Sequence, residues 1–140
     1  MLIKRLTVSL FLSVSLVALV GCSSSSKTEH SGTHNVEMDL VPIKVELRWS
    51  PDEVTVDQKV IFEAEVTQDD SPVNDAKEVV FEIVNMQDEG QKIELKGKLI
   101  EDGIYQAEGT LSKVGEYSVT SHVTARTQHS MPSKELTVQP

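Results

Sequence analysis

The sequence predicts an all-β domain: an antiparallel sandwich of about seven strands over residues 42–140. Apolar and polar residues alternate from Ile43 to Val138, which is the period of strands with one face in a core and one in water. Turn-forming residues interrupt this alternation at short intervals. Helical periodicity of useful length occurs only before Cys22. Together these observations favour sheets over helices.

The expected strands follow one another between turn signals. The stretch 69–75 is rich in Asp, Asn, Ser and Pro, and Asp102-Gly103 is a typical turn pair. The expected strands are 43–49, 60–66, 79–83, 93–99, 104–111, 115–125 and 135–139. So many short strands in about a hundred residues are typical of an immunoglobulin-like antiparallel β-sandwich.

Two aromatic residues are expected to have structural roles. The Cys-Trp-Cys core of antibody domains is absent, because Cys22 is the only cysteine. We expect Trp49 to fill the core from the first strand instead. The run Gly115-Glu116-Tyr117 resembles a tyrosine corner, in which a tyrosine near the start of a strand donates a hydrogen bond to the backbone upstream.

Residues 1–21 have the layout of a lipoprotein signal peptide. Lys4 and Arg5 precede an apolar run at 6–20, and Leu19-Val20-Gly21-Cys22 resembles a bacterial lipobox. A transmembrane helix needs about 20 apolar residues, whereas this run has 15, four of them hydroxyl side chains. We therefore expect cleavage before Cys22, lipidation of that cysteine, and a protein anchored in the cell membrane on its extracytoplasmic face.

Residues 22–41 are expected to form a flexible tether, because four serines follow Cys22 and apolar periodicity is nearly absent. His30, His34 and Met38 recur in it at four-residue spacing. Such a tail can capture metal adventitiously, or it can be a solvated linker with scattered histidines, since nothing in it fixes ligand geometry.

The charge of the chain argues against a nucleic-acid partner. Without residues 1–21, the chain has 11 basic and 22 acidic side chains, a net charge of −11. Phosphate binding needs a basic face. The acidic residues keep an exposed domain soluble, and a negative surface also concentrates cations.

Motifs for catalysis are missing, so the sequence predicts no enzyme. There is no nucleophile elbow, H-E-x-x-H motif, P-loop or dinucleotide glycine fingerprint. Paired carboxylates such as Glu63 and Glu65 are expected on a solvated strand face. The acidic stretch 69–75 lacks the EF-hand spacing and glycine, which favours a polar turn over a calcium site.

His122, His129 and Met131 form the remaining candidate site. In an extended chain, His129 and Met131 point to the same side about 6.6 Å apart, and a hairpin partner strand can bring His122 alongside. Imidazole with thioether favours copper, and the thioether suits Cu(I). The alternative is that these side chains only shape a loop.

Several segments resemble the YtkA-like or FixH-like extracytoplasmic domains of bacterial lipoproteins. The resemblance spans about residues 41–138, and its most specific part is the closing H-V-T-A-R…H-x-M-P pattern. The matching segments are 50–53, 62–68, 71–76, 80–83, 102–105, 121–126 and 129–132. His122, His129 and Met131 match that pattern position by position. In one departure, residues 91–99 lack the Met and His that related domains tend to carry, and Met86 is the nearest substitute.

The resemblance implies an immunoglobulin-like sandwich on the outer face of the cell membrane. It also implies a loose link to metal transport and respiratory oxidase assembly, with no established enzymatic activity. We therefore expect a membrane-anchored lipoprotein that binds copper for metal handling or oxidase assembly. The alternative is a structural or protein-interaction module of the cell surface that binds no metal. The sequence names no protein partner.

Overall fold

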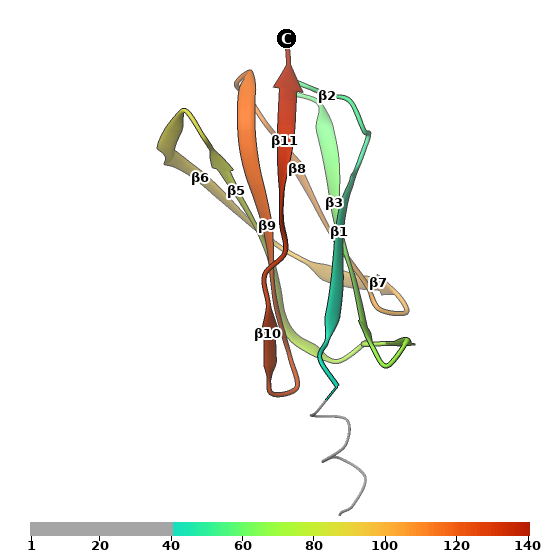
Figure 1. Ribbon diagram of the computed structural model, residues 1–140. Helices are drawn as coiled ribbons and strands as arrows, with labels where there is room; N and C mark the ends of the chain where they lie inside the picture. The colour runs from blue at the N-terminus through green and yellow to red at the C-terminus, as the bar shows by residue number, and fades with distance from the viewer. Residues whose placement is uncertain (1–40) are drawn as a thin grey trace, which may run out of the picture. The chain divides into compact units, whose positions relative to one another are not determined.

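The fold was determined as a computed structural model, which describes residues 41–140 (Figure 1). The expected signal peptide, the lipidation site Cys22, and His30, His34 and Met38 lie outside the described residues. Within 41–140 the chain forms strands and turns only, so the predicted all-β class is confirmed. No helix of this part of the chain could cross a membrane.

Eleven strands run through residues 41–140. Their bounds are β1 (Lys44–Ser50), β2 (Val54–Thr55), β3 (Lys59–Gln68), β4 (Ser71–Pro72), β5 (Ala76–Asn85), β6 (Asp88–Lys96), β7 (Lys98–Glu101), β8 (Ile104–Thr110), β9 (Gly115–Ala125), β10 (Gln128–Ser130) and β11 (Ser133–Gln139). They form two sheets, which we call sheet A and sheet B. Sheet A has the order β1-β3-β8-β7, with β4 on β3; sheet B has the order β2-β11-β9-β5-β6, with β10 on β9. All neighbours are antiparallel except β11 and β2.

Six of the seven expected strands are confirmed, and the fourth is corrected. The stretch 93–99 is split between the two sheets, because the chain leaves β6 in sheet B and enters β7 in sheet A at Gly97. A Cβ on Gly97 would lie 2.8 Å from Cγ1 of Val79, so the crossing packs too closely for any side chain. The alternation also stops there, and Leu99, expected to face inward, is exposed.

The core lies between the two sheets. Phe62 on β3 and Phe81 on β5 are fully buried, with ring centroids 6.1 Å apart. Around them, every second residue of β3, β5 and β9 is buried, as the alternation predicts. All the buried apolar side chains belong to residues 43–138. A chain that begins at Ser23 therefore retains the whole core of the described domain.

Hydrogen bonds from two tyrosines fix loops to this core. The hydroxyl of Tyr117 donates to the carbonyl of Lys113 at 2.9 Å, which confirms the tyrosine corner. The hydroxyl of Tyr105 donates to the carbonyl of Val73 at 3.0 Å and accepts from the N–H of Ala76 at 3.1 Å. Trp49 was expected to fill the core, and its burial was overestimated. It lies on the edge strand β1, is only half-buried, and packs against the rim of the core.

The stretch 69–75 forms a polar turn tied to a second turn. Oδ1 of Asn74 accepts from the N–H of Gly103 at 2.6 Å, and its Nδ2 donates to Asp102 at 3.0 Å. Gly103 has φ of +69°, and an added Cβ would lie 2.7 Å from the carbonyl of Val66. Oδ1 of Asn74 thus stabilises the turn at Gly103.

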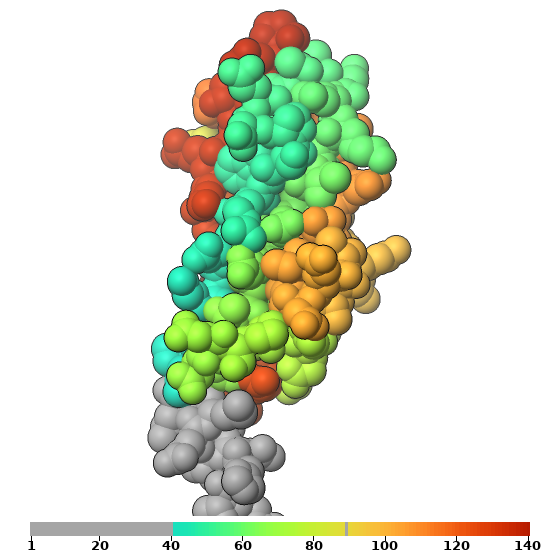
Figure 2. Space-filling view, turned by 90° about the vertical axis from the view of Figure 1, so that its right-hand side faces the viewer, coloured from blue at the N-terminus to red at the C-terminus, as the bar shows by residue number. Residues whose placement is uncertain are grey.

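Figure 2 looks onto the side where β1, β3 and β7 of sheet A reach the surface. On β1 and β3 of this sheet, Nη2 of Arg48 lies 2.9 Å from Oε1 of Glu63 and 2.6 Å from Oε2 of Glu65. The two carboxylates are on the outer face, as expected, and the guanidinium between them balances part of their charge. Exposed pairs of this kind contribute little to stability.

Replacing Phe62 or Phe81 with alanine should lower the free energy of unfolding by about 3 to 5 kcal/mol, because each change leaves a cavity between the sheets. Urea denaturation of a chain beginning at Ser23 measures this. Ile100→Ala is the matched control, since Ile100 is 53% exposed and should change stability by no more than about 0.5 kcal/mol. A near-zero change in the free energy of unfolding for both variants would contradict the placement of the two phenylalanines in the core.

Candidate metal site

His122 lies on the outer face of sheet B. On β9 the side chains of Val119, Ser121 and Val123 are buried, so the alternate positions, including His122, point away from the core. The His122 side chain is 30% exposed. Its strand is flanked by β5 on one side and by β10 and β11 on the other, which fixes its direction.

His129 lies beside His122 on the same face. It is in β10, paired with Thr124 of β9, and its Nδ1 is 2.8 Å from Oγ1 of Thr124. The ring centroids of His122 and His129 are 6.2 Å apart. Two imidazoles bound to one ion, each with a metal–nitrogen distance of about 2 Å, have centroids about 5 to 6 Å apart. The separation of the two rings is therefore close to the range for a shared metal, for which a nitrogen of each ring has to face the other.

The strand register places Met131 opposite His122. His129 pairs with Thr124, and Ser133 pairs with Thr120, so β10 and β11 keep one register along β9. Between them, the N–H of Ser121 donates to the carbonyl of Pro132 at 3.0 Å. Met131 is 55% exposed.

Two residues before and two residues after Met131, the side chains of His129 in β10 and Ser133 in β11 lie on the same face as His122. His129 bonds to Thr124, and Oγ of Ser133 lies 3.0 Å from Oγ1 of Thr120. Thus the described structure brings the two predicted histidines together and sets Met131 across from one of them.

Nε2 of His122 is buried from solvent and makes no hydrogen bond. Its nearest charged neighbour is Oε2 of Glu82, 3.8 Å away on β5. Because β5 and β10 flank β9 on opposite sides, this nitrogen lies toward β5, and a metal shared with His129 needs the His122 ring to turn or to bind through Nδ1. On His129, a proton donated from Nδ1 to Thr124 leaves the Nε2 lone pair for a metal.

Glu82 belongs to an ion-pair cluster beside this site. Nζ of Lys92 on β6 lies 2.6 Å from Glu82 and 2.8 Å from Glu94. The hydrogen bond from Lys92 lowers the pKa of Glu82 below its ordinary value of 4.5, and the same contact raises the pKa of Lys92. Glu82 therefore stays ionised near His122 at neutral pH.

The donor set decides which metals fit. Across residues 41–140, no three His, Cys, Asp or Glu side chains are close enough together to hold an ion. A three-ligand site here thus needs the thioether of Met131, which favours Cu(I) over zinc. Met86, the other methionine in this part of the chain, donates its N–H to Glu116 at the opposite end of β9 and is no substitute.

Sequence reasoning missed two neighbours of the site, Thr124 as the partner of His129 and Glu82 as the neighbour of His122. Thr124 was visible as a strand residue, but its pairing depends on the turn at Arg126, which has a positive φ of 55°. Glu82 comes from a strand about 40 residues earlier, and only the β5–β9 register brings it close.

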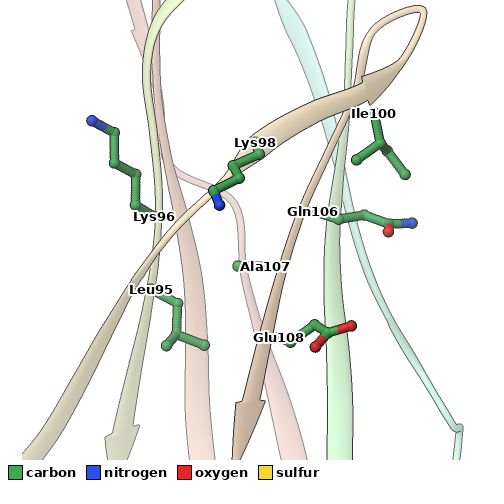
Figure 3. Close-up of a pocket in the computed structure, with 7 residues that line it drawn as sticks. All are labelled: Leu95, Lys96, Lys98, Ile100, Gln106, Ala107 and Glu108. Atoms are coloured by element: carbon green, nitrogen blue, oxygen red, sulfur yellow. The ribbon is translucent and has the colours of Figure 1, made fainter.

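A cavity of about 410 Å³ lies elsewhere, where β6 crosses to β7 beside β8 (Figure 3). Its lining residues are Leu95, Lys96, Lys98, Ile100, Gln106, Ala107 and Glu108. This lining contains no histidine or methionine, so the cavity is separate from the candidate metal site.

The pKa of Glu82 gives a testable pH dependence. Replacing Lys92 with glutamine should raise the Glu82 titration midpoint toward 4.5, measured by the NMR shift of its carboxyl carbon. A carboxyl with a lowered pKa stabilises the fold above its unfolded pKa, and this contribution disappears as pH falls through the folded value. The stability difference between wild type and Lys92→Gln should thus shrink below about pH 4.5. An unchanged midpoint would contradict the Lys92–Glu82 contact.

Comparisons with known proteins identify the family and the fold of the chain. The model of the YtkA-like family matches residues 37–122, which include His122 but stop before His129 and Met131. No curated protein matches the chain. A Legionella pneumophila protein of the DUF4785 family has a similar structure, with a TM-score of 0.53 and 13% identity.

That likeness covers 69% of this chain and 28% of the Legionella protein, so this chain corresponds to a small part of the other and shares its fold alone. The family match covers more than half of the chain. The two-sheet β-sandwich and this match together show that the chain belongs to the YtkA-like family of extracytoplasmic-type domains.

Proposed function

We propose that this protein is a lipid-anchored extracytoplasmic lipoprotein that binds copper through His122, His129 and Met131. It acts as a binding domain in metal handling or respiratory oxidase assembly and has no catalytic step of its own. The single observation that carries the metal proposal is the pair of imidazoles, 6.2 Å apart on one sheet face, with Met131 opposite one of them.

The ligand types support Cu(I) as the bound ion. Two neutral imidazoles and one thioether supply three uncharged donors of the kind that Cu(I) accepts. At this site Met131 is 55% exposed and the His122 side chain is 30% exposed, although Nε2 of His122 is buried. The exposed Met131 suits an ion that is passed to another protein, because an incoming ligand can approach the metal from that side.

The second candidate function is a structural or protein-interaction module without metal. One observation favours it: the hairpin already has its own hydrogen bonds. His129 is held by Thr124, and Ser133 by Ser118 and Thr120. These hydrogen bonds hold the hairpin in place without a metal ion. The test is therefore a direct measurement of metal binding.

Cu(I) affinity is measured by competition with a chromophoric chelator. The chain begins at Ser23 and carries alanine at His30, His34 and Met38, so that only the domain binds. His122→Ala and His129→Ala should each weaken Cu(I) and Zn(II) binding tenfold or more, about 1.4 kcal/mol. Met131→Leu should weaken mainly Cu(I). Met86→Leu is the matched control, since Met86 is 50% exposed at the other end of β9.

Affinity should also fall as the solution is acidified, because protons compete with the metal for the imidazole nitrogens. Equal Cu(I) affinity in the parent chain and in a variant lacking His122, His129 and Met131 would contradict the copper site and favour the metal-free function.

Anchoring is tested separately at Cys22. In cells fed labelled fatty acid, Cys22→Ala should abolish incorporation of the label and release the domain or leave its signal peptide uncleaved. Two or more acyl chains, at about 0.8 kcal/mol per buried methylene, make a stable anchor. Ser23→Ala is the control and should retain the label. Labelled Cys22→Ala protein would show that the lipid is carried elsewhere.

A further inference from the structure

Within residues 41–140, β6 is an edge strand of sheet B. It is nine residues long and in this part of the chain pairs only with β5, whereas the opposite edge, β2, has two residues (Figure 1). A long free edge presents a row of backbone donors and acceptors that another strand can pair with. The edge is also apolar at its centre, because Ile93 is 36% exposed.

The side chains of β6 alternate between the inner and the outer face of sheet B. Its pairing with β5 sets Ile93 opposite Ile83 and Leu95 opposite Phe81, both buried, so Ile93 and Leu95 are on the inner side. Lys92, Glu94 and Lys96 therefore lie on the outer face. Along that face the charges read plus, minus, plus.

We propose that β6 pairs in antiparallel fashion with β6 of a second copy of this chain, about a two-fold axis at Ile93. In this register each Ile93 lies opposite its own counterpart, and Lys92 lies opposite Glu94 of the second copy, twice by symmetry. The pairing covers the exposed isoleucine and joins the two copies of sheet B into one sheet.

The charge pattern excludes the neighbouring registers. A two-fold axis at Lys92 would set two lysines against each other, and an axis at Glu94 would set two glutamates together; like charges directly opposite are destabilising. A shift of the pairing by a single residue would place inner side chains against outer ones. An axis at Leu95 would also set Glu94 opposite Lys96, but β6 ends at Lys96, so only residues 94–96 of each copy would pair. The axis at Ile93 combines opposite charges with the longer overlap.

The edge strand of sheet A offers a weaker alternative. An axis at Leu47 on β1 would also pair Glu46 with Arg48 of a second copy. However, Leu47 is 1% exposed, so that pairing would cover no new apolar residue at its centre. Arg48 on β1 and Lys92 on β6 are both already paired within the chain, so the exposure of the central residue is what favours β6.

The test is disulfide trapping in a chain beginning at Ser23, which contains no cysteine and retains the whole core. Ile93→Cys should form a disulfide-linked dimer under mild oxidation, because opposite Cα atoms across the axis are about 4.5 to 5.5 Å apart. Gln91→Cys is the matched control. Two Gln91 positions are offset by four residues, about 13 Å, and should cross-link at least tenfold less. Equal cross-linking of the two variants would overturn the proposal.

A charge exchange tests the register. In the Ile93→Cys chain, Lys92→Glu or Glu94→Lys alone should lower the cross-linked fraction at least threefold, and the double variant should restore it, because each charge again faces its opposite. Circular dichroism and thermal unfolding confirm that each variant is folded. Loss of cross-linking in the double variant, with the fold intact, would refute pairing about Ile93.

Discussion

The register of β9 within sheet B is the constraint on which both the core and the candidate site depend. Its inward residues, such as Val119 and Val123, pack in the core, and its outward residues include His122 and Thr124. A slip of one residue would move His122 into the core and Val123 into water. The hydrophobic effect that keeps Val123 in the core therefore also places His122 on the outer face of the sheet, beside His129. In β9, one and the same strand register is required for core packing and for the geometry of the candidate site.

Pro132 separates β10 from β11 without changing their register on β9. A proline has no N–H to donate, yet its carbonyl accepts from Ser121, so the ladder continues past it. The local break leaves Met131 outside both strands and exposed. That combination, fixed in register but free of the ladder, suits a ligand that must reach an ion beside His122.

The sequence allowed most of the fold to be predicted, because alternation is a local signal. It marked β1, β3, β5, β8, β9 and β11, and it identified the tyrosine corner at Tyr117. It failed at Gly97, since the crossing between sheets depends on the close approach of Val79. It overstated the burial of Trp49, because position on an edge strand is a property of sheet order rather than of local pattern.

For the candidate site, residue types and spacing identified His129, which lies in β10, and Met131, which follows that strand, as candidates. The contribution of Glu82 could not be predicted, because it depends on how β5 pairs with β9. The same limit applies to the β6 edge. Its alternating charges are visible in the sequence, but their position on a free edge, with Ile93 exposed between them, follows only from the order of the strands.

Paired copies would keep their metal sites apart. From β9 the sheet runs through β5 and β6 to the two-fold axis and then through β6 and β5 of the second copy, five strand spacings or about 24 Å. An axis perpendicular to the sheet leaves both sites on the same face. Neither site borrows a ligand from the other copy, since His122, His129 and Met131 all belong to one hairpin. Pairing would therefore present two independent sites in one direction, and each site would keep its own affinity for copper.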